Sequence, residues 1–180
     1  MSDQPGQRRP LPGSWSVRQG RDAYLAENGF STQAYDARWT AASIAGVRFR
    51  VPNTARHRSA IMLHDLHHVA TGYGTDLVGE VEVSAWECRG GLRALGAYTG
   101  AIVGGLALLG LLRAPRRTLR AWRASRRASL FRLSDHAYDE LLALRIAALR
   151  RLLAVPETGL AREPRRLHAH APQAPARAAE

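Results

Sequence analysis

The sequence predicts an all-α protein, a single helical domain of about six helices with disordered termini. Helix caps of the Ser, Thr and Asp type recur before apolar-periodic segments, and glycines follow several of them. Only one short segment alternates as a strand would. A length of 180 residues supports one domain with a modest core, and a hydrophobic content of 46% excludes global disorder.

The two ends of the chain are expected to be disordered. Residues 1–14 are polar and carry Pro and Gly, with no apolar stretch of the signal-peptide kind. Residues 156–180 are rich in Ala, Pro, Arg and His without periodicity, so their His168 and His170 are left out of any site. The helical domain is therefore expected to span residues 15–155.

The first part of this domain is predicted to hold two short helices and one extended segment. The first helix is expected over Asp22–Asn28, ended by the following glycine. Ser31 or Thr32 can cap a second helix that includes Trp39. Ala45–Val51 alternates apolar and basic residues before a proline, which predicts a short strand or extended arm.

Two central helices follow. Thr54 can cap a helix over Ala55–Thr71. After a glycine-containing turn, Thr75 or Asp76 can open a second helix, which the glycine pair 90–91 ends. Helices joined by so short a turn are expected to lie antiparallel.

The next segment, Ala94–Leu112, has 19 residues and no charge. Gly96, Gly100 and Gly104 lie four residues apart and would let another helix approach closely. Three interpretations are open: a membrane span, the buried central helix of a soluble bundle, or the wall of an apolar cavity for a prenyl chain.

An arginine-rich stretch then runs over residues 113–132, with eight Arg and no acidic residue. Its face is predicted to carry Arg116, Arg120, Arg123 and Arg127. Such a face can be simply solvated, or bind anionic lipid headgroups or nucleic acid. The apolar segment before it favours a membrane surface. The chain has no nucleic-acid motif and no aromatic residues interleaved as a stacking platform, so no nucleic-acid partner is expected.

The last helix is expected to start at Ser134 or Asp135. Its predicted buried stripe consists of Leu141, Leu144, Ala148 and Leu152.

Composition adds two expectations about the cell. The net charge is +11 and all 26 basic residues are Arg, a usage that indicates a GC-rich, bacterial genome. The single cysteine, Cys88, excludes an intrachain disulfide and fits a reducing compartment.

The central helices carry the most informative residues. His64 and His68 lie about 40° apart on one helical face. Asp65 flanks that face, and Glu80 lies early in the following helix. An i, i+4 histidine pair alone also occurs in ordinary cores, but the added acidic residues favour a metal site. The set His64, Asp65, His68 and Glu80 is predicted to bind a divalent ion, with Zn²⁺, Fe²⁺ and Mn²⁺ all suited to it.

Two neighbouring residues have more than one interpretation. His67 is expected to pack or donate a hydrogen bond and not to bind the ion. Glu87 follows Glu80 by seven residues on the same helical face. It can support a metal ligand from behind, or form a surface salt bridge with Arg89 or Arg93.

The pattern His-Asp-x-x-His, eleven residues, Glu resembles the signature of the Coq4 family of ubiquinone-biosynthesis proteins. The stretch HDLHHVATGYGTDLVGEVEVSAWE places His64, Asp65, His68 and Glu80 on the metal-site positions of that signature. Gly72, Gly79 and the pair Trp86-Glu87 match its later positions. The resemblance is strong over residues 52–90 and weaker to about residue 155, and the first fifty residues differ from the family.

This resemblance implies a function in ubiquinone or related prenyl-quinone synthesis. The activity ascribed to the family is oxidative decarboxylation at ring C1 of a polyprenylated hydroxybenzoate. The implied cofactor is a divalent metal, Zn²⁺ first and Fe²⁺ as the alternative, with Asp65 as a fourth ligand or an orienting residue. No catalytic residue beyond these is assigned.

The implied partners are a prenylated quinone precursor or other isoprenoid lipid and other quinone-biosynthesis proteins. The resemblance also implies a homodimer, with a contact on the helix over Ala94–Leu112. The chain would bind peripherally to the cytoplasmic face of a bacterial membrane. The main alternative is a non-catalytic scaffold that binds prenyl lipid, with a purely structural metal. A hydrolase or lyase acting on some other lipid is a third interpretation.

Overall fold

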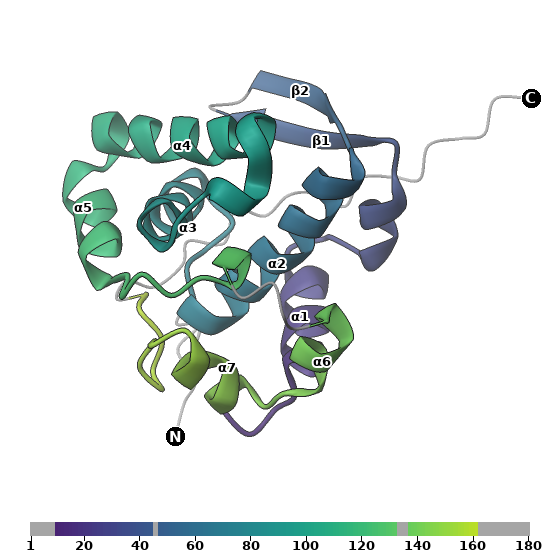
Figure 1. Cartoon of the computed structure of the whole chain (residues 1–180), viewed down its shortest axis with the longest axis vertical. Coiled ribbons are helices and arrows are strands. Elements are labelled where there is room, and N and C mark those ends of the chain that lie inside the picture. The colour runs from purple at the N-terminus through teal and green to yellow at the C-terminus, as the bar shows by residue number, and fades with distance from the viewer. Residues whose placement is uncertain (1–9, 45–46, 133–136, 162–180) are drawn as a thin grey trace, which may run out of the picture.

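The computed structural model describes residues 10–44, 47–132 and 137–161, and it confirms the all-α class (Figure 1). Within these residues there are seven α-helices and one two-stranded antiparallel sheet. The helices are α1 (Val17–Glu27), α2 (Ala55–Thr71), α3 (Leu77–Gly90), α4 (Gly96–Arg113), α5 (Pro115–Ala124), α6 (Tyr138–Ala143) and α7 (Ile146–Leu152). The strands are β1 (Trp39–Ile44) and β2 (Val47–Pro52), and three short 3₁₀ helices are η1 (Thr32–Asp36), η2 (Arg93–Leu95) and η3 (Leu130–Arg132).

Helix α2 runs through the middle of the molecule. Helices α3, α4 and α5 lie on one side of it, and α1, α6 and α7 lie on the other (Figure 1). One apolar core joins these groups, with Leu66 of α2, Trp86 of α3 and Leu149 of α7 all fully buried. The central position of α2 places its side chains against both halves of the fold.

The first helix starts earlier than predicted. Ser16 forms a capping box with Gln19: its hydroxyl accepts from the Gln19 amide at 3.1 Å, and the Gln19 side chain accepts from the Ser16 amide at 2.9 Å. Two free amides of the first turn are thereby satisfied, so α1 begins at Val17. The predicted helix containing Trp39 is wrong, because that turn is only the short η1 and Trp39 starts β1.

The predicted strand near residues 45–51 is confirmed as β2. Its partner β1 was not predicted. The two strands pair antiparallel from Trp39 opposite Pro52 to Ile44 opposite Val47. Residues 45 and 46, at the start of the predicted strand, lie outside the described residues.

The caps of the two central helices are those that the sequence indicates. Thr54 accepts from the His57 amide at 3.2 Å and opens α2. Gly72 ends α2 with a φ of +80°, a left-handed conformation that glycine adopts freely. Asp76, one of the two candidates, accepts from the Gly79 amide at 2.8 Å and opens α3.

Gly79 brings the turn between these helices very close to α3. A Cβ atom on Gly79 would lie 2.2 Å from the carbonyl oxygen of Gly74, which is backbone and cannot swing away. The absence of a side chain at Gly79 therefore lets the turn fold onto the first turn of α3, beside Glu80.

Helix α4 is not the buried central helix that one interpretation predicted. Its buried residues are Thr99, Val103 and Gly110, whereas Leu108 is 65% and Leu112 is 81% exposed. Within the described residues, the segment Arg93–Arg113 is long and apolar enough to cross a membrane, by length and composition only.

The glycine stripe predicted on this helix is closely approached within the chain only at Gly96, where a Cβ would lie 2.7 Å from a guanidinium nitrogen of Arg56. A Cβ on Gly104 would meet nothing within 4 Å, and one on Gly100 would make only ordinary contacts. The close approach of neighbouring helices occurs outside the stripe, at Gly110, where a Cβ would lie 2.6 Å from Thr118 and 2.8 Å from Val81. Gly110 is therefore the point at which α3, α4 and α5 meet.

Helix α5 is strongly amphipathic and is tied to α3 by a buried carboxylate. Arg117 donates to Glu82 through two nitrogens, at 3.1 and 2.7 Å, and Arg120 lies 3.5 Å from the same carboxylate. The predicted arginine face ends early, because α5 stops at Ala124 and Arg127 has a φ of 62°. Arg127 therefore cannot extend that face.

The predicted last helix is two helices. Backbone pairing with the N-terminal segment breaks it: Val17 donates to the Leu144 carbonyl at 2.8 Å, and Ile146 donates to the Trp15 carbonyl at 2.9 Å. The fully buried apolar residues here are Leu141, Leu142, Ile146, Leu149 and Leu153. The predicted stripe is confirmed at Leu141 and only in part beyond it, because Leu144 and Leu152 are half-buried and pack against the edge of the core. The predicted caps Ser134 and Asp135 lie outside the described residues.

Arg150 joins three distant parts of the chain. Its guanidinium is buried and donates to the carbonyls of Leu11 at 3.0 Å, Ala70 at 3.1 Å and Glu157 at 2.7 Å. The packed structure thus includes residues on both sides of the predicted boundaries at 14 and 156. Residues 1–9 and 162–180 of the predicted disordered ends lie outside the described part of the chain.

Candidate metal centre

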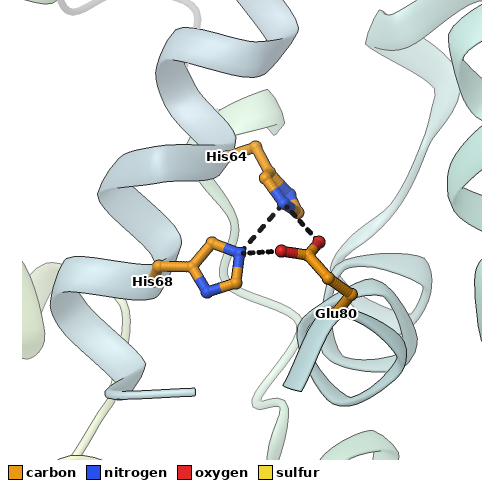
Figure 2. A group of neighbouring side chains, drawn as sticks. All are labelled: His64, His68 and Glu80. Atoms are coloured by element: carbon orange, nitrogen blue, oxygen red, sulfur yellow. Dashed lines mark hydrogen bonds and ion pairs between the residues drawn. The ribbon is translucent and has the colours of Figure 1, made fainter. Parts of the chain in front are cut away.

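Three of the four predicted ligands meet between α2 and α3. His64 and His68 project from one face of α2 and Glu80 from the first turn of α3, all toward one point (Figure 2). The two histidine Nε2 atoms are 3.0 Å apart. The carboxylate oxygens of Glu80 lie 3.3 Å from Nε2 of His64 and 3.5 Å from Nε2 of His68.

These separations suit a small divalent ion. Ligand atoms that each lie about 2.0 Å from a tetrahedral Zn²⁺ are about 3.3 Å from one another. The two Nε2 atoms are 3.0 Å apart, and each lies 3.3 or 3.5 Å from a different oxygen of Glu80, distances close to that value. Two imidazoles and one carboxylate also form a ligand set that Zn²⁺ and Fe²⁺ both accept. The group can therefore hold a metal ion.

The ring of His68 is held from behind. Its Nδ1 lies 3.0 Å from the backbone carbonyl of Tyr73. A carbonyl can only accept, so Nδ1 carries the proton and Nε2 presents its lone pair toward Glu80. The ring is buried and stacks on Tyr24 with centroids 5.3 Å apart.

The ring of His64 is held in the same way by a carboxylate. Its Nδ1 lies 2.8 Å from Oε1 of Glu87, which is fully buried. Glu87 also lies 2.7 Å from Nδ1 of His67, and the Leu130 amide donates to Nε2 of His67 at 3.0 Å. Because that amide needs an acceptor, His67 is protonated at Nδ1 and donates to Glu87.

The two Nε2 atoms therefore face each other at 3.0 Å with both Nδ1 positions already used. Two lone pairs at this distance repel, so positive charge must lie between them, either a proton or a metal ion. This arrangement therefore favours the binding of a cation between the two rings.

The pKa shifts of the groups in the site also indicate that it favours a positive charge. Burial opposes a charge on His64, but the Glu87 and Glu80 carboxylates raise its pKa well above the ordinary value. Burial favours neutral carboxyl groups, yet His68 and His64 hold the pKa of Glu80 below its usual range. His64 and His67 similarly lower the pKa of Glu87 to about 2. Without an ion, the two carboxylates favour a proton on the His64 ring, and a bound divalent ion would displace that proton.

One side of the group is open to solvent. The His64 side chain is 20% exposed and that of Glu80 is 28% exposed, whereas His68 is fully buried. Three protein ligands leave a fourth tetrahedral position free, which is typical of catalytic sites and not of structural ones. An ion held here can therefore be reached by water or by another molecule.

Asp65, the fourth predicted ligand, lies beside this group and outside the set of converging donors. Tyr35 donates to its carboxylate at 2.5 Å, and burial raises the pKa of Asp65. Asp65 thus joins α2 to η1 and adds negative charge close to the two histidines.

The structure resolves the two residues left open by the sequence. His67 packs against Trp86 and Phe131 and forms hydrogen bonds through both ring nitrogens, as predicted. Glu87 contacts His64 from behind and forms no surface salt bridge with Arg89 or Arg93 among the described residues. Sequence reasoning did not identify the Tyr73 carbonyl as a partner of His68. The Gly72 turn, which reverses the chain there, was the available signal.

The fold and the site together define a class: an all-α protein with a two-histidine, one-carboxylate group that can hold a metal ion. No family model, curated protein or solved structure matches the chain.

Proposed function

We propose that this chain is a metal-dependent protein of prenyl-quinone biosynthesis, of the kind that its resemblance to the Coq4 family implies. The observation that supports the metal dependence is the pair of Nε2 atoms of His64 and His68, which face each other beside Glu80. The resemblance over residues 52–90 supports the choice of pathway.

In this proposal His64, His68 and Glu80 hold the ion, and Asp65 adds charge beside them. The ion supplies Lewis acidity toward an oxygen of the ring substrate, or redox chemistry with O₂ if it is Fe²⁺. An oxidative decarboxylation favours Fe²⁺, because Zn²⁺ has no redox chemistry. The free fourth position gives the substrate's polar head access to the ion.

A peripheral membrane position belongs to the same proposal. Six of the nine exposed large apolar side chains of the described residues lie on α4 and α5: Tyr98, Leu108, Leu111, Leu112, Leu119 and Trp122. We name these six residues the α4–α5 face. Arg116 and Arg123 on α5 are exposed, so apolar and cationic groups occur together on this part of the molecule. An anionic bilayer offers both an apolar layer and negative headgroups.

The metal content of purified variants tests the first part of the proposal. We expect about one divalent ion per chain in the wild type, and background content in His64→Ala and Glu80→Ala. Glu82→Gln is the matched control, because Glu82 is a buried carboxylate on the same helix that pairs with Arg117 and not with the site. Retention of metal by either ligand variant would contradict the assignment.

Quinone profiling tests the pathway. A deletion strain should lack its prenyl-quinone and recover it with the wild-type gene, but not with Glu80→Gln, which preserves volume and weakens the ligand. Normal quinone in the deletion strain would refute the role. Full rescue by Glu80→Gln would instead support the scaffold alternative.

A further inference from the structure

Glu87 contacts the candidate metal ligand His64 but is not one of the three converging ligands. Its carboxylate is fully buried in α3, and Oε1 accepts from Nδ1 of both His64 and His67, at 2.8 and 2.7 Å. Its second oxygen, Oε2, is buried with no hydrogen-bond partner among the described residues. A buried carboxylate is unfavourable unless a positive charge compensates it.

Apart from His64, the neighbours of Glu87 do not supply that charge. The Leu130 amide donates to Nε2 of His67, so this nitrogen carries no proton and His67 is a neutral donor. The arginines near α3, Arg117 and Arg120, pair with Glu82. The compensating charge must therefore arrive on the His64 side, where the ion would lie.

A divalent ion meets this requirement. Glu80 and Glu87 carry two negative charges, and an ion of charge +2 balances them through the His64 ring. The same hydrogen bond orients that ring, because Nδ1 bonded to Glu87 leaves Nε2 aimed at Glu80 and His68.

We propose that Glu87 is the positioning residue of the metal centre, held in place by a chain of hydrogen bonds that runs from the Leu130 amide through His67 to Glu87 and His64. This inference rests on the proposed metal site and adds how the site is oriented and charged. It also connects η3, which lies far along the sequence, to a metal ligand.

Titration with Co²⁺ tests the proposal, because its visible absorption reports binding directly. Glu87→Gln keeps an acceptor oxygen but removes the charge, and Glu87→Met removes both. We expect Co²⁺ affinity to fall by about 10-fold in Glu87→Gln and about 100-fold in Glu87→Met, the range seen when such supporting partners are lost. Glu82→Gln also removes a buried carboxylate of α3, and it should lose stability but keep wild-type Co²⁺ affinity.

A second measurement does not depend on metal. In the metal-free protein the Nδ1 protons of His64 and His67 should give slowly exchanging, downfield proton NMR signals, because each donates to buried Glu87. Glu87→Met should lose the His64 signal, since that ring is 20% exposed and would have no acceptor.

These results separate the two proposals. A wild-type protein that binds no Co²⁺ but shows both ring signals would refute the metal site and leave the orienting chain. Wild-type Co²⁺ affinity in both Glu87 variants, or an equal loss in Glu82→Gln, would overturn the role of Glu87. Should Glu87→Met fail to fold, Glu87→Gln and Glu82→Gln still decide the question.

Discussion

His57 is a buried histidine that lies outside the candidate metal centre. It lies on the first turn of α2, near Thr99 and the ring of Tyr98, and its Nε2 has no hydrogen-bond partner among the described residues. Burial lowers its pKa below the ordinary value of 6.5. The unfolded chain therefore takes up a proton at a higher pH than the folded one, so folding stability is lost as the pH falls below about 6.5.

Urea unfolding at pH 7.5 and 5.5 measures this effect. The wild type should lose more stability on acidification than His57→Leu, which has no titrating group there. Titration of His64 works in the opposite direction, since its folded pKa is raised, but it is common to both proteins and cancels in the comparison. Equal losses in the two proteins would show that His57 does not titrate differently on folding.

At the residue scale, the candidate metal ligands can be predicted from the sequence, but the residues that hold them in place cannot. His64, His68 and Glu80 are recognisable because helical periodicity and one short turn fix where they point. The partner of Asp65 is Tyr35, thirty residues earlier, and no local pattern relates the two. Glu87 had two interpretations because periodicity gives its helical face, whereas its hydrogen-bond partners His64 and His67 lie on another helix.

The close packing of the α2–α3 turn against helix α3 depends on the absence of a side chain at Gly79. We expect Gly79→Ala to destabilise the fold by about 2 kcal/mol or more, because its Cβ would overlap the Gly74 carbonyl. Since α3 would have to move away from the turn, Glu80 would move with it and Co²⁺ binding should weaken. Thermal unfolding and Co²⁺ titration measure the two effects.

Gly104→Ala provides the matched comparison. A Cβ there meets nothing within 4 Å, and the residue lies inside helix α4. Alanine restricts the unfolded chain and favours helix, so this variant should gain about 0.5–1 kcal/mol and keep metal affinity. A destabilised Gly104→Ala would mean that this face is already covered in solution, as a dimer contact would require.

Elements whose ends are decided locally are those that the sequence predicts well. The caps of α2 and α3, Thr54, Gly72 and Asp76, act within three or four residues. The break between α6 and α7 follows instead from pairing of Leu144 with Val17, more than a hundred residues away. A helical pattern through residues 138–152 cannot reveal that break.

Binding to vesicles tests the membrane position of the whole molecule. We expect the wild type to bind vesicles containing anionic lipid, more weakly at 0.5 M salt than at 0.1 M, because salt screens the arginines. Replacing both Leu108 and Leu112 by Asp should reduce binding about 10-fold or more, since both side chains are exposed on the α4–α5 face.

Phe30→Asp is the control, because Phe30 is 53% exposed but lies outside that face. Binding that neither salt nor the double substitution changes would contradict the peripheral position. Protein that alkaline carbonate cannot remove from native membranes would show that α4 spans the bilayer.

The hydrogen bonds of Arg150 have a consequence for the order in which a growing chain can fold. They join residue 150 to Leu11 and to Ala70, and Arg145 likewise donates to the Ser14 carbonyl at 2.7 Å. During synthesis, α2 and α3 leave the ribosome with the three candidate ligands, and η3 follows with the Leu130 amide that holds His67. The segment that precedes α1 has to wait until residues 144–150 have emerged, because its backbone partners are there. The segment before α1 thus docks after the three candidate ligands have been synthesised, so the candidate metal centre can assemble before that segment is in place.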